Sequence, residues 1–460
     1  MRITAIIMRG IAVLLSVCRC CSLNAQPTVK LAEATIGNDL YHLSWQNKHA
    51  SSFSYLLKGN KKPVSIAFPS FEINGRNTAI LLDNLHLAAP PVALINQVQV
   101  FTCEGTLVNN SSIRVQMDFA VAPGNPVLRF RYRLRSDDSA ALTRNGHRDR
   151  ITYLAFHVPQ EQAKEVSFSK FDERFHATHL SEQTIDGRFF EDSLNCMGPM
   201  LVANDAGMTY LVAYEHGSPY GNRFLQYQFN EKGNVRLEAL KGNYLNGEKV
   251  NDFTTLWFEL AAVNGNENLL ADNYRTFVLD FLSVNKESRK PYIFYNTWGR
   301  QERVQWRGGK YLSSMNLQET LKEIDRAHQM GIEVYVIDAG WFNLTGDWDV
   351  NTRFFPDSLK QVKKRLDDYG MKLGLWFNPT VAAVKSRMYA ANTGNRISWN
   401  DSFPPPSPVW ETPTSTGLCM VSSYWNDFAA KLIELNRQLG VTYFKWDGIG
   451  QYGCNDAHHY

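Results

Sequence analysis

The pattern of hydrophobic and polar positions changes once along the chain, near residue 284. From Gln26 to Ser283, short alternating runs such as YHLSWQ, VLRFRYRLRS and MTYLVAYEHG are separated by Asn, Gly, Asp and Pro. Alternation with a period of two predicts strands that are buried on one face, and the frequent turn residues predict short connections between them. Residues 26–283 are therefore predicted to form an antiparallel β-sandwich.

After Lys290, continuous apolar runs alternate with stretches of helical period. The apolar runs are PYIFYNTW, IEVYVIDAGW, MKLGLWFNP and VTYFKWDG, and helices that end at Gly331, Gly370 and Gly440 precede the last three. Strands that are apolar on both faces and alternate with helices predict a parallel sheet, either doubly wound or closed into a barrel. No phosphate-binding glycine motif follows any of these strands, which removes the usual nucleotide-binding interpretation.

Polar or aromatic residues end every one of these four strands, as in enzymes built on a (β/α)8 barrel. Four strands are half of such a barrel, so residues 284–460 are predicted to be its N-terminal half. The connection from Thr380 to Ser423 contains the stiff segment FPPPSPVWETPTS. A connection of this length is typical of a lid over a site or of a surface insertion, and both interpretations stay open.

The first 25 residues are predicted to be an export signal. Arg2 and Arg9 precede a short apolar stretch, and SLNA before Gln26 is a suitable cleavage sequence. The stretch is too short to span a bilayer, and no later segment is a candidate for a membrane span. The protein is thus expected to be periplasmic or extracellular, with a lipid anchor at Cys18 as the alternative.

Charge and cysteine content argue against a nucleic-acid-binding protein and against a metal site. The chain has 48 Lys and Arg against 45 Asp and Glu, and the leader contains three of the arginines, so the mature chain is balanced and lacks the basic surface of a nucleic-acid-binding protein. Cys103, Cys196, Cys419 and Cys454 remain after the leader. They show no CxxC spacing, so neither zinc nor another metal is expected. Their disulfide pairing stays open.

Asp447 is the strongest catalytic candidate. It follows the last predicted strand two residues after Lys445, whose ammonium group is expected to keep the carboxylate ionised. An ionised, positioned carboxylate can attack the anomeric carbon of a sugar and form a covalent glycosyl intermediate. The structural alternative is a Lys–Asp ion pair that closes one end of the sheet.

Four more residues at the predicted strand ends are candidates for sugar binding. Asp338 in VIDAGWF can accept two hydrogen bonds from sugar hydroxyl groups, or it can cap the following loop. Trp298, Trp341 and Trp376 all lie at the same predicted rim. One such aromatic is ordinary packing, but three at one rim predict a wall on which a sugar ring stacks.

The ordered motifs NTWG, VIDAGWF, GDWDVNTRFFPDSLK, GLWFNP and FKWDG resemble those of the α-galactosidase (melibiase) families of retaining glycoside hydrolases. The pattern is most similar to family thirty-six, in which a β-sandwich precedes the barrel. The resemblance implies that Asp447 is the nucleophile and that Lys445 and Asp338 hold sugar hydroxyl groups. It also implies that Trp376 lines the sugar pocket, and that no metal or organic cofactor is needed.

Three departures from the family pattern bear on function. Ala339 replaces the second aspartate of the D-D-G-W motif, and a lost charged hydrogen bond costs about 1.5–3 kcal/mol of binding. Asn378 replaces the acid of W-F-E-P. The acid/base carboxyl of the family comes from the sixth strand, so these 460 residues are expected to be a truncated reading of a longer protein without that residue.

The predicted function is hydrolysis of terminal α-linked galactose from oligosaccharides. The alternatives are another retaining α-glycosidase, a transglycosylase, or a non-catalytic carbohydrate-binding fragment. The expected partner is an oligosaccharide. Whether identical chains form an oligomer stays an open question.

Overall fold

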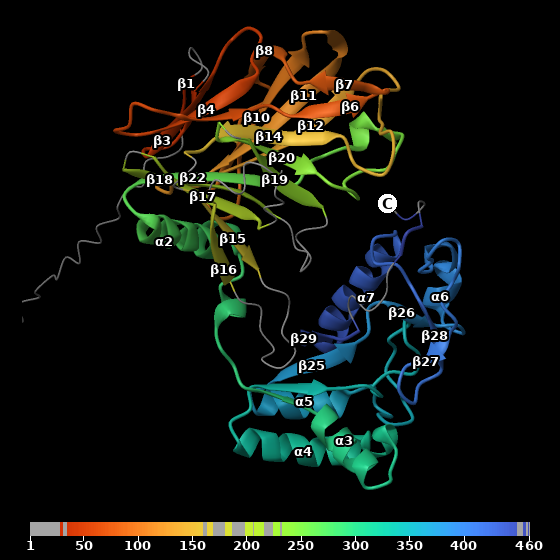
Figure 1. The fold of residues 1–460 in the computed structure, drawn as a ribbon. Helices are drawn as coiled ribbons and strands as arrows, with labels where there is room; N and C mark the ends of the chain where they lie inside the picture. Colours follow the sequence, from red (N-terminus) through yellow and green to blue (C-terminus); the bar gives the residue numbers. More distant parts are fainter. Residues whose placement is uncertain are drawn as a thin grey trace, which may run out of the picture. The chain divides into compact units, whose positions relative to one another are not determined.

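The structure is a computed structural model that describes residues 28–30, 35–159, 163–168, 180–185, 198–205, 207–215, 224–230, 232–448, 454–456 and 459. The predicted leader, residues 1–25, lies outside them. The chain divides into two compact units, Met1–Asn285 and Lys286–Tyr460, and each is described by itself (Figure 1). The domain boundary predicted at residues 283 and 284 is close to this division.

In the part of the first unit that the structure describes, the strands form two antiparallel sheets. In β12 (Leu128–Ser136), buried and partly exposed residues alternate strictly, as in a strand with one face against a core. The twelve strands of the first sheet are β1 (Thr28–Lys30), β2 (Thr35–Gly37), β3 (Tyr41–Trp45), β4 (Ser52–Leu57), β5 (Val64–Ala67), β14 (Ile151–His157), β6 (Ser70–Ile73), β13 (Ala141–Leu142) and β21 (Glu248–Lys249) in spatial order, with β7 (Arg76–Ala79) beside β6, and β20 (Asn234–Ala239) between β14 and β19 (Leu225–Phe229). The ten strands of the second are β16 (Leu180–Ile185), β15 (Ala163–Phe168), β17 (Met200–Asp205), β18 (Met208–Tyr214), β22 (Phe258–Asn264), β12, β11 (Asn110–Val121), β10 (Gln99–Leu107) and β8 (Leu82–Leu87), with β9 (Val92–Ala93) beside β10.

The inner faces of the two sheets share one hydrophobic core. Phe53 of β4 contacts Phe119 of β11 and Phe130 of β12 edge-on, with ring centroids 5.4 and 5.0 Å apart. The outer face of the second sheet packs on α2 (Glu267–Phe277), whose Leu270 and Phe277 are buried against it. The N-terminal unit is therefore a sandwich of antiparallel sheets, as predicted. Short helical turns lie at η2 (Val250–Asp252), η3 (Val278–Leu282) and η4 (Glu287–Arg289).

The second unit is built on a parallel sheet, with helices in the connections between its strands (Figure 1). Its order is β23 (Phe294–Asn296), β24 (Val334–Ile337), β25 (Lys372–Phe377) and β29 (Val441–Trp446), and every neighbouring pair is parallel. The helices are α3 (Trp298–Trp306), α4 (Leu317–Gln329), α5 (Lys360–Asp368) and α7 (Tyr424–Leu439), with the turn η5 (Tyr311–Ser314) before α4. The predicted parallel β/α arrangement is confirmed.

The helix boundaries follow the local signals in the sequence. The side chain of Asn316 accepts a hydrogen bond from the backbone N–H of Glu319 at 3.0 Å, which caps α4. Gly331, Gly370 and Gly440 have φ angles of +77°, +67° and +63° after α4, α5 and α7. This left-handed conformation ends each helix, and glycine adopts it without the steric cost that a Cβ brings.

The first parallel strand is shorter than predicted. The run PYIFYNTW is continuous and apolar, but only Phe294–Asn296 is a strand. The Asn296 side chain accepts a hydrogen bond from the Trp298 N–H at 3.0 Å, and α3 begins at Trp298. This local turn ends the strand, because an asparagine side chain bonds readily to the backbone two residues on.

The long connection from Thr380 to Ser423 contains an ordered substructure. The strands β26 (Val381–Ala383), β28 (Thr414–Gly417) and β27 (Ser407–Pro408) form a small antiparallel sheet. The helix α6 (Arg387–Ala391) and the turn η6 (Thr393–Asn395) lie in the same connection. Among the described residues, no helix has the length and apolar content needed to cross a membrane.

Candidate active site

Three of the predicted site residues lie in one row across the parallel sheet, at the C-terminal ends of its strands. Trp376 of β25 pairs with Lys445 of β29, and the register between β24 and β25 brings Asp338 to the same level on the other side. Two residues earlier in β25, a Cβ at Gly374 would lie 2.9 Å from a side chain of β24 and 3.0 Å from one of β29. Glycine thus leaves room over β25 for side chains of the two flanking strands.

Asp338 and Lys445 form an ion pair across this row. The Lys445 Nζ lies 2.7 Å from the Asp338 Oδ2. The other oxygen, Oδ1, accepts a hydrogen bond from the Ala339 N–H at 2.8 Å. Asp338 is 1% exposed, whereas the Lys445 side chain is 26% exposed. The pair therefore leaves the ammonium group partly exposed and keeps the carboxylate buried.

Asp447 follows β29 and is held by N–H groups. Its Oδ2 accepts from the Trp376 Nε1 at 3.1 Å and its Oδ1 from the Gly448 N–H at 2.8 Å. Its own N–H donates to the Phe377 carbonyl at 2.9 Å, so the backbone continues the sheet register. The carboxylate is partly exposed. Donors to both oxygens fix its orientation while leaving it accessible.

The expectation that Lys445 pairs with Asp447 is wrong. Among the described residues, no cation lies within ion-pair distance of Asp447, and the ammonium group of Lys445 binds Asp338 instead. Although Lys445 and Asp447 are two residues apart and on the same face of the strand, such neighbours are about 6–7 Å apart along a strand. The carboxylate across the row is closer.

The predicted wall of three tryptophans is not present. Trp341 is fully buried, and its Nε1 donates to the Trp376 carbonyl at 2.8 Å. Trp376 is 1% exposed and stacks on Phe342, with centroids 5.9 Å apart. Trp298 begins α3 rather than ending a strand, and it contacts other aromatic side chains of the 298–314 and 380–423 connections. A large indole buries more area in the core than at the rim of the sheet. Trp341 and Trp376 are therefore part of the core rather than of a sugar-stacking wall.

A buried polar network that the sequence did not reveal supports the end of β24. The Gln301 Nε2 donates to the Ala339 carbonyl at 2.8 Å, and its Oε1 accepts from the Thr297 hydroxyl at 3.1 Å. The Thr297 hydroxyl in turn accepts from the Asp338 N–H at 2.9 Å. Thr297 and Gln301 are polar residues four apart at the start of a helix, and this spacing is the sequence signal for their cooperation.

Ala339 and Asn378, which depart from the family motifs, are both buried near the candidate site residues. The Ala339 methyl group is completely buried, next to the carboxylate of Asp338. Asn378 is buried, and its Oδ1 accepts from the N–H and hydroxyl of Thr380 at 3.2 and 2.9 Å. Its amide also packs on the Cα of Gly448, where a Cβ would lie 2.6 Å from the Asn378 Nδ2. Asn378 therefore supports the turn that carries Asp447.

Comparison with known proteins shows what the part of the chain around this site is similar to. The melibiase family model matches residues 305–451. α-Galactosidase 1 of Pediococcus pentosaceus is 30% identical over 131 residues, which are 27% of this chain and 17% of that protein. The α-galactosidase of Escherichia coli is 25% identical over 166 residues, 34% of this chain and 22% of that protein. The A type blood α-D-galactosamine galactosaminidase of Flavonifractor plautii is 22% identical over 154 residues, 32% of this chain and 14% of that protein.

Solved structures extend the likeness to nearly the whole chain. The GH36 α-galactosidase AgaB of Geobacillus stearothermophilus gives a TM-score of 0.64 at 12% identity, covering 94% of this chain and 68% of that chain. The α-galactosidase of Lactobacillus brevis gives 0.61 at 16% identity, covering 91% and 64%. The chain thus spans about two thirds of these structures, and the likeness shows its fold, a sandwich followed by part of a barrel. Residues 305–451 thus match the melibiase family model, and the chain is similar in sequence over this part to α-galactosidases and in fold to those of GH36 type.

Proposed function

We propose that this chain contributes the sandwich and the first half of the (β/α)8 barrel of a retaining glycoside hydrolase that releases terminal α-linked galactose from oligosaccharides. The observation that carries the proposal is the accessible carboxylate of Asp447. It stands at the C-terminal end of a parallel strand, oriented by the Trp376 indole and the Gly448 N–H. The similarity to α-galactosidases supports the same reaction.

In this proposal, Asp447 attacks the anomeric carbon of the sugar. The bond between that carbon and the leaving oxygen breaks, and an aspartyl glycosyl ester forms. Water then attacks the same carbon, loses a proton to the second carboxyl group of the reaction, and releases the aspartate. Lys445 donates to a sugar hydroxyl group from above the sheet, and Asp338 positions Lys445 through the 2.7 Å ion pair. A second carboxyl must protonate the leaving oxygen, and we assign this role to no residue of the described chain.

The substrate is proposed to be an oligosaccharide. AgaA of Geobacillus stearothermophilus, in a structure with raffinose, gives a TM-score of 0.60 at 13% identity and covers 92% of this chain and 66% of that chain. Ala339 favours a second candidate, another α-glycosidase such as an α-N-acetylgalactosaminidase, because the family carboxylate that holds galactose hydroxyl groups is absent there. The similarity to the Flavonifractor plautii enzyme is consistent with this candidate. Export of the chain remains a proposal that rests on residues 1–25.

The test is covalent labelling of the full chain. The protein is incubated with fluorinated α-glycosyl fluorides of galactose, glucose and N-acetylgalactosamine that trap the glycosyl enzyme, and the adduct is found by intact mass and peptide mapping. Labelling at Asp447 is expected with the galactosyl reagent. Asp447→Asn must abolish it, and Asp368→Asn, an exposed carboxylate of α5, must not.

The orientation of the nucleophile gives a second readout. Trp376→Phe keeps an aromatic ring at this position but removes the N–H that binds Asp447. Loss of a hydrogen bond to a charged group costs about 1.5–3 kcal/mol, so labelling should slow by about 10- to 100-fold. If only the glucosyl and N-acetylgalactosaminyl reagents form adducts, the chain is not an α-galactosidase, and the second candidate, another α-glycosidase, takes its place. Sugar binding without any adduct would instead indicate the non-catalytic carbohydrate-binding alternative.

A further inference from the structure

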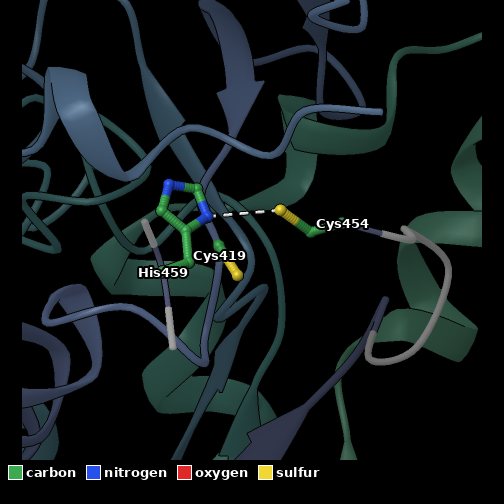
Figure 2. Close-up of side chains that lie close together, drawn as sticks. All are labelled: Cys419, Cys454 and His459. Carbon is green, nitrogen blue, oxygen red and sulfur yellow. Dashed lines mark hydrogen bonds between the residues drawn. The ribbon is translucent and has the colours of Figure 1, made fainter. Parts of the chain in front are cut away.

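Three side chains with soft metal-binding atoms converge beyond the candidate active site. Cys419 follows β28, whereas Cys454 and His459 belong to the segment after Asp447. One ligand atom from each lies within 4.8 Å of the other two, and the Cys454 Sγ is 3.2 Å from the His459 Nδ1. Figure 2 shows this ring nitrogen directed toward Cys454, with Cys419 beside the ring. We call these three residues the thiol–imidazole cluster.

The hydrogen bonds of His459 prepare its Nδ1 to bind a cation. The Nε2 lies 2.9 Å from the Gly394 carbonyl oxygen. A carbonyl oxygen only accepts, so the proton of the neutral ring is on Nε2 and the lone pair is on Nδ1. Histidines that bind metals show this same arrangement, in which the second ring N–H donates to a backbone carbonyl or carboxylate.

The backbone around the cluster is held by contacts that do not involve the thiols. The Cys419 N–H donates to the Asn395 carbonyl at 2.8 Å. On the other side, the Asn455 N–H donates to the Ser398 carbonyl at 3.0 Å, and the Asn455 and Asn400 side chains join at 2.8 Å. Asn455, which follows Cys454, is thereby fixed on the 380–423 connection, and the three ligand atoms meet without a large rearrangement.

The dimensions and charges suit zinc. Tetrahedral Zn²⁺ with sulfur at about 2.3 Å and nitrogen at about 2.0 Å has ligand atoms about 3.5–3.8 Å apart. The cluster is close to this size, and small side-chain rotations complete it. Two thiolates and a neutral imidazole balance the charge of Zn²⁺. Electrical neutrality matters here because Cys419 and His459 are both buried.

We propose that Cys419, Cys454 and His459 bind one Zn²⁺, with release of the two thiol protons and with a non-protein ligand such as water in the fourth position. The ion would connect the segment after Asp447 to the 380–423 connection. The sequence predicted no zinc site because the four cysteines after the leader show no CxxC spacing. Cys419 and Cys454 are 35 residues apart, and the fold brings them together.

Cobalt titration of the full chain tests this proposal. The protein is purified without oxygen, treated with a chelator, and titrated with Co²⁺, which reports thiolate ligands by its charge-transfer and visible bands. One equivalent is expected to give the spectrum of a tetrahedral site, and Zn²⁺ should displace it. Cys454→Ser and His459→Ala should weaken binding by about 100-fold or more.

Cys103→Ala is the matched control, since Cys103 is a buried free cysteine of β10 in the other unit. Its spectrum should equal that of the unaltered protein. The remaining cysteines are present in every variant, so a difference reports on the cluster alone. Absence of the tetrahedral spectrum, an unchanged spectrum in Cys454→Ser, or a Cys419–Cys454 disulfide in the oxygen-free protein would each overturn the zinc site. None of these outcomes depends on labelling at Asp447.

Discussion

Removal of the Lys445 ammonium group should destabilise the parallel unit far more than removal of an exposed lysine. Lys445→Met leaves the Asp338 carboxylate 1% exposed, with the Ala339 N–H as its one remaining partner among the described residues. Breaking a fully buried ion pair from one side costs about 3–5 kcal/mol. Since the Lys445 side chain is 26% exposed, the expected loss of unfolding free energy is smaller, about 2–3 kcal/mol.

A double-mutant cycle isolates the interaction. Lys445→Met, Asp338→Asn and the double variant are unfolded in urea, and tryptophan fluorescence follows the unit that begins at Lys286, because nine of the eleven tryptophans lie in it. The double variant buries no unpaired charge. It should therefore be more stable than the sum of the single changes predicts, by about 2 kcal/mol.

The chain contains a control pair at the same distance. Lys364 and Asp368 of α5 also lie 2.7 Å apart, but their side chains are 74% and 52% exposed. The same cycle on this pair should give about 0.3–0.5 kcal/mol. Equal coupling energies for the two pairs would refute the conclusion that burial makes the Asp338–Lys445 pair strong.

Three further predictions concern other parts of the chain. Burial raises the pKa of Glu259 to about 8, so the folded state holds a proton that the unfolded state releases near pH 4.5. The unfolding free energy of the first unit should fall as the pH rises from about 5 to 8, by up to about 1.4 kcal/mol per pH unit in urea titrations, and Glu259→Gln should flatten this slope. Gly448→Ala places a Cβ 2.6 Å from Asn378 at φ +73°. It should lower the urea midpoint more than Gly370→Ala, which has φ +67° and open space. Asn316→Ala removes the cap of α4 and should cost about 1 kcal/mol in the same assay, and an unchanged midpoint would contradict the capping role.

Much of the fold was predictable because its signals are local. The alternation in β12, the cap at Asn316 and the glycines after three helices each act within a few residues, and the structure contains them as predicted. The end of the first parallel strand was not predicted. Its apolar run continues past Asn296, but an asparagine side chain bonding to the backbone turns the chain there.

The positions of the site residues at the strand ends were predictable from the sequence, but the contacts between their side chains were not. Placing Asp338, Trp376 and Lys445 at strand ends requires only the strand pattern. Which of them touch depends on register, because the side chain across the row is closer to Lys445 than the one two residues along. The burial of Trp341 and the convergence of Cys419 on Cys454 likewise depend on contacts between distant segments, which spacing along one chain does not encode.

The link from Trp341 through Trp376 to Asp447 has a consequence for how specificity can change. One indole anchors the backbone of the next strand, and the second indole anchors the carboxylate. In the proposed reaction, the attacking oxygen of Asp447 would thus be held by an aromatic core in which Trp341 and Trp376 are buried. On this proposal, substitutions in the loops around the carboxylate would change sugar preference, whereas substitutions of the buried indoles would lower reactivity toward every sugar alike.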